Sequence, residues 1–164
     1  MHAGKNLRAL KSPSERRLNG TTEIMLAVVV FMVSSLIQND VWAGGSCVIA
    51  KRLGDSLAIE WVASSKVSAE TALLQAKQQL LEQGYRKKGQ DVHAQASSDL
   101  THAYLVIVKT VYTTTLGKSR TSYGCGFSAR TATEAEQAAL YNLRNYSWGW
   151  QPEFGYEVLK RVRY

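Results

Sequence analysis

An internal repeat restricts the possible folds of this chain more than any other feature of the sequence. A shift of 63 positions aligns residues 46–86 with residues 109–149 without a gap and matches nine residues. The matches fall at positions with the same expected role, such as a Leu-Gly pair in a turn and apolar residues spaced four apart. Such a repeat predicts two copies of one small supersecondary unit.

Each copy has the pattern of a hairpin followed by a helix. Short runs of β-branched residues flank a glycine-containing turn at residues 53–56 and again at 116–119. The helices are predicted to begin after Ser68 and after Thr131, where a side chain can cap the first backbone N–H groups, and the first to stop at Gly84. Each helix has one apolar stripe, formed by Ala72, Ala76 and Leu80 and by Ala135, Ala139 and Leu143.

The remaining segments complete the expected architecture. Residues 86–99 are polar and are predicted to be a linker, and apolar residues alternate after Pro152, which predicts a last strand. The predicted fold class is α+β. Two ββα repeats and a C-terminal strand would form one largely antiparallel sheet with both helices on one face.

The N-terminal part has the pattern of an export signal. Residues 24–37 carry no charge, five Lys and Arg residues precede them, and residues 41–43 read Val-Trp-Ala. A membrane-spanning helix needs about 20 apolar residues, so this run favours a signal peptide at 24–43 that is cleaved after Ala43. Residues 1–23 would be its basic flank and 44–164 a single domain. The alternatives are an uncleaved signal-anchor, with residues 44–164 outside the cytoplasm, and a buried core helix.

The division of the chain changes how its charge is interpreted. The whole sequence has a formal net charge of +7, but residues 44–164 hold fifteen Lys and Arg against ten acids, which is near +5. This moderate excess suits a protein near anionic envelope surfaces and gives no strong indication of nucleic-acid binding. We therefore expect no nucleic-acid partner, and membrane contact only through residues 24–37 if they stay uncleaved.

Two segments resemble a known family. Residues 47–50 (Cys-Val-Ile-Ala) with the Ser68-Ala-Glu-Thr-Ala segment, and residues 123–128 (Tyr-Gly-Cys-Gly-Phe-Ser) with 133–140, are similar to units of small secreted bacterial proteins of unknown function. Those units consist of a short hairpin and an Ala-Glu-Ala-rich helix, and the resemblance covers residues 46–143. The resemblance implies an exported protein with this hairpin-and-helix fold, and it implies no particular reaction because the family has none defined. The family usually has a cysteine near the helix end, where this chain has Leu80 and Leu143, so its disulfide pattern does not transfer.

Few residues suggest covalent or metal chemistry. Cys47 and Cys125 could form one bridge in an oxidising compartment, worth about 2–4 kcal/mol, or could be two buried thiols. No Cys-x-x-Cys or His-x-x-x-His pattern occurs, so we expect no metal and no cofactor. Residues 124–126 (Gly-Cys-Gly) lack the Lys-Ser/Thr of a phosphate loop, and their glycines favour a strand that a helix approaches closely.

The C-terminal segment is the strongest candidate surface. Residues 141–164 hold seven of the fifteen aromatic residues, interleaved with basic ones. Exposed Trp and Tyr beside Arg are typical anchors of protein interfaces, although such rings can also cover a core. The predicted binding residues are Trp148, Trp150, Arg144 and Arg161, with Lys118 and Arg120 of the second hairpin as rim charges.

These features predict an exported periplasmic or cell-envelope binding protein without catalytic activity. One specific form of the hypothesis is an inhibitor or immunity protein that occludes a partner enzyme, and a cell-wall glycan is the alternative ligand. Two other hypotheses remain open. One is a small secreted hydrolase that uses His93 or His102 with a serine or aspartate. The other is a structural component of a membrane-anchored envelope complex.

Overall fold

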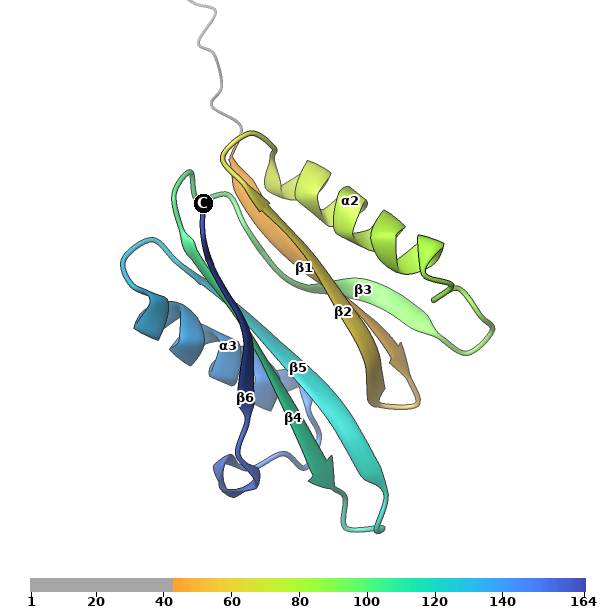
Figure 1. Cartoon of the computed structure of the whole chain (residues 1–164). Helices are drawn as coiled ribbons and strands as arrows, with labels where there is room; N and C mark the ends of the chain where they lie inside the picture. Colours follow the sequence, from red (N-terminus) through yellow and green to blue (C-terminus); the bar gives the residue numbers. More distant parts are fainter. Residues whose placement is uncertain (1–42) are drawn as a thin grey trace, which may run out of the picture. The chain divides into compact units, whose positions relative to one another are not determined.

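The computed structural model describes residues 43–164 (Figure 1). The predicted basic flank and nearly all of the predicted signal segment, residues 1–42, lie outside the described residues. The described residues, 43–164, form one compact unit.

The predicted α+β class is confirmed for this unit. Its elements follow in the order β1 (Gly44–Arg52), β2 (Asp55–Ser64), α2 (Ala69–Glu82), β3 (Asp91–Ser98), β4 (Tyr104–Thr113), β5 (Ser119–Ser128), α3 (Ala132–Tyr146), the short 3-10 helix η1 (Pro152–Phe154) and β6 (Glu157–Arg163).

The strands of residues 43–164 form two antiparallel sheets of three strands each. In the first sheet β1 lies between β2 and β3, and in the second β4 lies between β5 and β6. This corrects the expectation of one sheet with both helices on one face. The third strand of each half pairs back onto the first, so each half completes a three-stranded sheet of its own, and the two sheets pack face to face.

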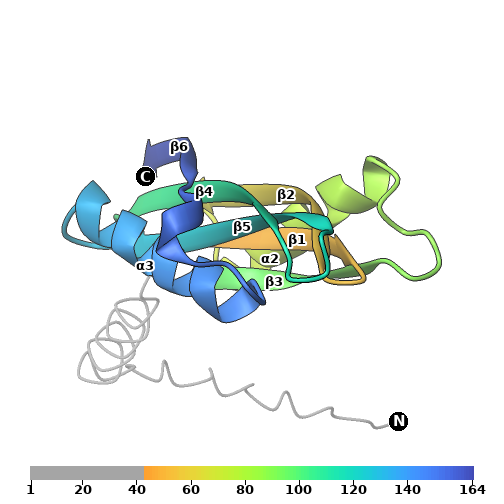
Figure 2. The same ribbon diagram turned by 90° about the horizontal axis from the view of Figure 1, so that it is seen from below.

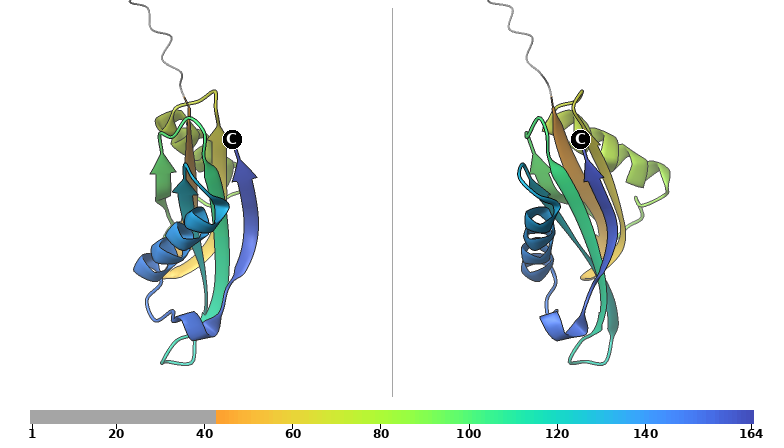
Figure 3. Two further views of the ribbon diagram at one scale, coloured as in Figure 1. Left: turned by 90° about the vertical axis from the view of Figure 1, so that its left-hand side faces the viewer. Right: turned by 60° about the vertical axis from the view of Figure 1, so that its left-hand side comes forward.

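The layers follow the order α2, first sheet, second sheet, α3 (Figure 2 and Figure 3). Each contact between layers has its own apolar cluster. The cluster under α2 contains Val48, Ala50, Ala76 and Leu80. The cluster between the sheets contains Cys47, Ile59, Leu105, Ile107 and Cys125. The cluster under α3 contains Val106, Val108, Tyr112, Ala135, Ala139, Leu143 and Trp150.

Strand β4 shows how the sequence produces these layers. Successive side chains of a strand point to opposite faces, so Val106 and Val108 contact α3 while Leu105 and Ile107 contact the other sheet. All four are fully buried. A continuous apolar run of this kind is the pattern of a strand that is covered on both faces.

The repeat is present, but its unit is larger than predicted. The segment 86–99, expected to be a linker, contains β3, which pairs with β1 as β6 pairs with β4. The true unit is therefore ββαβ. The first strands also align differently from the sequence shift of 63. The irregularity in pairing falls at Cys47/Val48 in one half and at Ile107/Val108 in the other, so Val48 corresponds to Val108.

The helix ends follow the predicted signals. The Ser68 and Thr131 side chains accept hydrogen bonds from the N–H groups of Thr71 and Glu134, each at 3.1 Å. Helix α2 ends just before Gly84, which has a φ of +93° that only glycine adopts easily. These caps fix where each helix starts and therefore which of its residues meet the sheet.

Candidate binding site

Helix α3 presents a second row of residues beside the stripe that packs on the sheet. Ala135, Ala139 and Leu143 are fully buried, with no exposed surface. Glu136, Leu140 and Arg144 are also spaced four apart, and each follows a residue of the buried stripe, so they form a neighbouring row along the helix. This row becomes one wall of the candidate site.

The segment after α3 forms the opposite wall. The chain turns at Ser147, where the Trp150 N–H donates to the Ser147 carbonyl, and η1 then leads into β6. Trp150 is only 8% exposed, and its ring N–H donates to the Gly155 carbonyl at 3.3 Å. These bonds hold residues 147–156, called the tail below, alongside α3.

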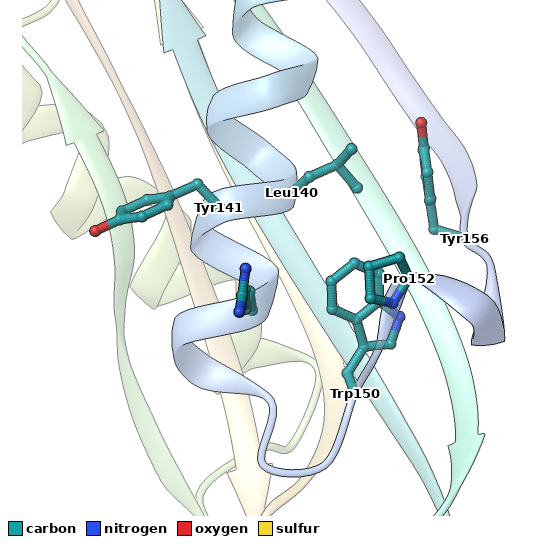
Figure 4. Close-up of a pocket in the computed structure, with 6 residues that line it drawn as sticks. Leu140, Tyr141, Trp150, Pro152 and Tyr156 are labelled. Carbon is teal, nitrogen blue, oxygen red and sulfur yellow. The ribbon is translucent and has the colours of Figure 1, made fainter.

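A groove lies between α3 and this tail (Figure 4). It has a volume of about 250 Å³. Its lining is mostly apolar and consists of Leu140, Tyr141, Arg144, Trp150, Pro152 and Tyr156. In Figure 4 the Trp150, Pro152, Leu140 and Tyr156 side chains gather around the groove, whereas the Tyr141 ring points away from it. The groove is the right size to take one bulky apolar side chain.

Arg144 gives the groove its charge. Its side chain is exposed, and it takes part in no ion pair within residues 43–164. A guanidinium group next to an apolar hollow can bind a carboxylate with two parallel hydrogen bonds. The arrangement therefore suits a ligand that has an apolar group and a neighbouring acid.

Beside the groove, Glu136 connects the helix with β6. Its carboxylate accepts hydrogen bonds from the Tyr156 hydroxyl at 3.0 Å and from the Arg161 guanidinium at 2.6 Å. The bond from Arg161 lowers the pKa of Glu136 below its ordinary value, and the bond to Glu136 raises the pKa of Tyr156. This network holds the Tyr156 ring in place at the groove.

The structure divides the predicted binding residues between two places. Arg144 and Trp150 line the groove, and Arg161 acts next to it through Glu136. Trp150 is a buried wall and not an exposed anchor. Lys118 lies in the loop just before β5, and Arg120, near the start of β5, lines a different hollow together with Trp148.

Sequence reasoning missed Leu140, Pro152, Tyr156 and Glu136. The spacing of Glu136, Leu140 and Arg144 was a readable signal, because residues four apart lie on one helix face. The other wall gave no such signal, since its position depends on how the tail folds back after residue 147.

The residues of the hydrolase hypothesis have other contacts. His93 lies on β3 with its Nδ1 2.8 Å from the Asp91 carboxylate, and His102 is exposed in the turn before β4. The Ser97 hydroxyl bonds with Ser46 at 2.8 Å, and Ser98 accepts from the Leu100 N–H. In the part of the chain that the structure describes, no three His, Cys, Asp or Glu residues gather as a metal site.

Two predictions about the second hairpin are confirmed. A side chain on Gly124 or Gly126 would overlap the backbone of α3, so these glycines do allow the helix to approach the strand closely. Cys125, between them, points the other way and forms a disulfide with Cys47 that joins the two sheets.

Comparison with known proteins gives no match: no family model, no curated protein and no solved structure is significantly similar to this chain. The resemblance to small secreted bacterial proteins therefore stays a prediction. In residues 43–164, neither helix is long and apolar enough to span a membrane.

Proposed function

We propose that this protein is an exported cell-envelope protein that acts by binding a partner protein, without catalysis of its own. The observation that carries this proposal is the groove between α3 and the tail, which combines an apolar lining with the ion-pair-free Arg144. The partner inserts a bulky apolar side chain between Leu140 and Tyr156 and places a neighbouring carboxylate on Arg144.

Charge supports an acidic partner. Residues 44–164 have a net charge near +5, and the nearest acid on the α3 row, Glu136, is already paired with Arg161. An acidic partner surface would be attracted by the net positive charge and would be repelled nearby by Glu153, which is exposed and directly follows Pro152 of the lining. Its binding would occlude the partner, as inhibitor and immunity proteins do.

Two observations support export. The Cys47–Cys125 disulfide is of a kind that persists in oxidising compartments outside the cytoplasm. Strand β1 begins at Gly44, the residue that would become the first after cleavage behind Ala43. Both fit a periplasmic or secreted protein whose signal segment is removed.

Site-specific cross-linking tests the proposal. A photoreactive amino acid is placed at Leu140 in the full chain, and a second version carries it at Leu74 on the exposed side of α2. We expect Leu140 to capture one envelope protein that Leu74 does not capture. The purified partner should then bind at least about tenfold more weakly to Arg144→Glu, because the substitution puts a like charge against its carboxylate.

Lys77→Glu is the matched control, since it makes the same reversal of charge at an exposed position on α2, away from the groove. It should bind the partner like the wild type. Identical captured proteins from both positions, or equal affinities of the wild type and Arg144→Glu, would contradict the proposal. If the cross-linked molecule is a glycan and not a protein, the ligand of the groove is the cell wall and the proposal of a protein partner is wrong.

A further inference from the structure

The β1–β2 turn and the β4–β5 loop lie at the same end of the molecule (Figure 1), and three large exposed apolar residues occur in the loops of this end. Leu53 in the β1–β2 turn and Leu116 in the β4–β5 loop are each 82% exposed. Trp148, in the loop after α3, is 93% exposed. Single exposed apolar residues are common, but three large ones in separate loops at one end of the molecule are unusual, and Leu53 and Trp148 line the same hollow.

Leu53 is also in an unfavourable backbone conformation. Its φ is +51°, in the left-handed region, and Gly54 follows with a φ of +80°. Two-residue hairpin turns of this kind favour Asn-Gly or Asp-Gly, because a bulky side chain is disfavoured there. The chain thus has an exposed leucine at a position where a polar residue would be more stable, and packing within residues 43–164 gives it no compensation.

The backbone at Trp148 is held by contacts with buried residues. Tyr112 is buried, its hydroxyl donates to the Trp148 carbonyl at 2.8 Å, and its ring stacks on Phe154 with centroids 6.0 Å apart. Between Trp148 and Leu53 lies a hollow of about 290 Å³ that is also lined by Arg120 and Thr114. The exposed indole is therefore held on a fixed base.

Basic residues surround these tips. Arg52, Lys118 and Arg120 lie in or next to the same turns, with the half-buried Lys51 behind them. The acids of this end are Asp55, which accepts a hydrogen bond from the Thr121 N–H, Glu153 in η1, and Asp91, which lies opposite Lys51 in the β1–β3 pairing, so four bases stand against three acids. The balance is positive, so an anionic surface is favoured.

We propose that this end contacts an anionic phospholipid membrane, with Leu53, Leu116 and Trp148 entering the headgroup region. Trp is favoured at the membrane interface, and Lys and Arg add attraction to anionic lipids. Arg120 and Thr114 provide donors for a lipid phosphate in the hollow. This surface is separate from the α3 groove and does not depend on the proposed function. It also extends the sequence-based expectation, which placed membrane contact only at residues 24–37.

Quenching by brominated lipids tests the proposal. The full chain is mixed with vesicles of phosphatidylethanolamine and phosphatidylglycerol that contain bromolipid, or with phosphatidylcholine vesicles that contain it. Sedimentation is not used, because residues 24–37 could hold the chain on a vesicle by themselves. We expect tryptophan emission to be quenched in the anionic vesicles, and Trp148→Phe to be quenched clearly less; any quenching of Trp42, which follows residues 24–37, is common to both proteins. The difference between the two proteins isolates Trp148 from the other tryptophans.

The double variant Leu53→Ser/Leu116→Ser keeps Trp148 and should reduce its quenching at least about fivefold, since two of the three inserted side chains are lost. Leu74→Ser on α2, which is 60% exposed, is the matched control and should behave like the wild type. Equal quenching of the wild type and Trp148→Phe would overturn the proposal. Unchanged quenching in the double variant, or equal quenching of Trp148 in neutral vesicles, would overturn it as well.

Discussion

Two glycines decide how closely α3 can lie on the second sheet. At Gly124 an added Cβ would overlap the Ala139 carbonyl, and at Gly126 it would overlap the Ala135 carbonyl and the Ala139 nitrogen. The helix has alanine at both facing positions, so the absence of a side chain on one element matches a small side chain on the other. This close approach also sets the position of the row that forms the groove.

Gly126→Ala should therefore destabilise the protein strongly. The atoms it meets belong to the α3 backbone, so the whole helix must shift, and overpacking of this kind costs about 3 kcal/mol. Urea unfolding measures the loss. Gly117→Ala is the control, because nothing lies within 4 Å of its Cβ and only its φ of +71° is unfavourable, which costs about 1 kcal/mol. Equal losses in the two variants would contradict the close-approach argument.

Glu136 predicts a specific response to acid. Hydrogen bonding to Arg161 lowers the pKa of this carboxyl from its ordinary value of 4.5 in the folded state. Its contribution to stability is therefore present above pH 4.5 and is lost as the pH falls through the lower folded-state pKa. The contribution is below about 1 kcal/mol because the pair lies near solvent.

Urea unfolding of the wild type and of Glu136→Gln at neutral and at acidic pH measures this response. The wild type should be more stable at pH 7, and the difference should disappear in acid, where both side chains are neutral. Glu153→Gln is the control, since Glu153 is exposed and forms no ion pair within residues 43–164. A pH-independent difference for Glu136→Gln would show that the network does not depend on the charge.

At the scale of elements, a small polar network joins α3 to both sheets. The Asn142 Oδ1 accepts hydrogen bonds from the Cys125 N–H at 3.1 Å and from the Gln95 Nε2 at 2.8 Å. Its Nδ2 donates to the Gln95 carbonyl at 2.9 Å. Asn142 therefore covers the outer edge of β5 and binds β3 of the other sheet, whose Gln95 is only 4% exposed.

Asn142→Ala should cost about 2–4 kcal/mol, because it leaves the Cys125 N–H and the Gln95 carbonyl without partners in a mostly buried place. Thermal or urea unfolding provides the value. Asn145→Ala on the same helix is exposed and should change stability by less than about 0.5 kcal/mol. If both variants have the same stability, the network contributes nothing to holding the elements together.

The elements that the sequence predicted correctly are those with strong local signals. Ser68 and Thr131 cap the helices as expected, and Leu-Gly turns connect both hairpins. Strand β3 was missed because its sequence, Asp91-Val-His-Ala-Gln-Ala-Ser-Ser98, has few β-branched residues and is stabilised by pairing with β1. Pairing between strands so far apart in the chain cannot be recognised from the hydrophobic pattern of either strand alone.

The division into two sheets was not predicted for a related reason. The apolar runs of β1 and β4 do indicate burial on both faces, but they do not say what covers each face. The groove was predicted only in part, because Arg144 and Trp150 come from the aromatic and basic segment while Leu140 and Tyr156 meet only after the tail turns back. Val111 also misled the alignment: it is 55% exposed, whereas Val48, its match in sequence, is fully buried.

At the scale of the whole molecule, the two halves are joined by one covalent bond in the middle of the cluster between the sheets. Cys47 lies on the central strand of the first sheet and Cys125 on an edge strand of the second, 78 residues apart in sequence. A bridge across so long a loop restricts the unfolded chain strongly and contributes about 2–5 kcal/mol. The halves also share Ile59, Leu105 and Ile107, so the fold does not depend on the bond alone.

The burial of this bond gives the last prediction. Cys47 is fully buried and Cys125 is 1% exposed, so a reductant reaches the sulfur atoms only when the sheets separate. Intact-mass measurement after reduction and alkylation should therefore show no added alkyl groups on the folded protein and two on the denatured protein. Alkylation of the denatured protein without reductant is the control and should add none, since no free cysteine exists in residues 43–164. Two alkyl groups in that control would show free thiols and contradict the bridge. The same spectrum gives the mass of the mature chain and therefore shows whether the chain is cleaved after Ala43. Cleavage there would support the export on which the proposed function depends.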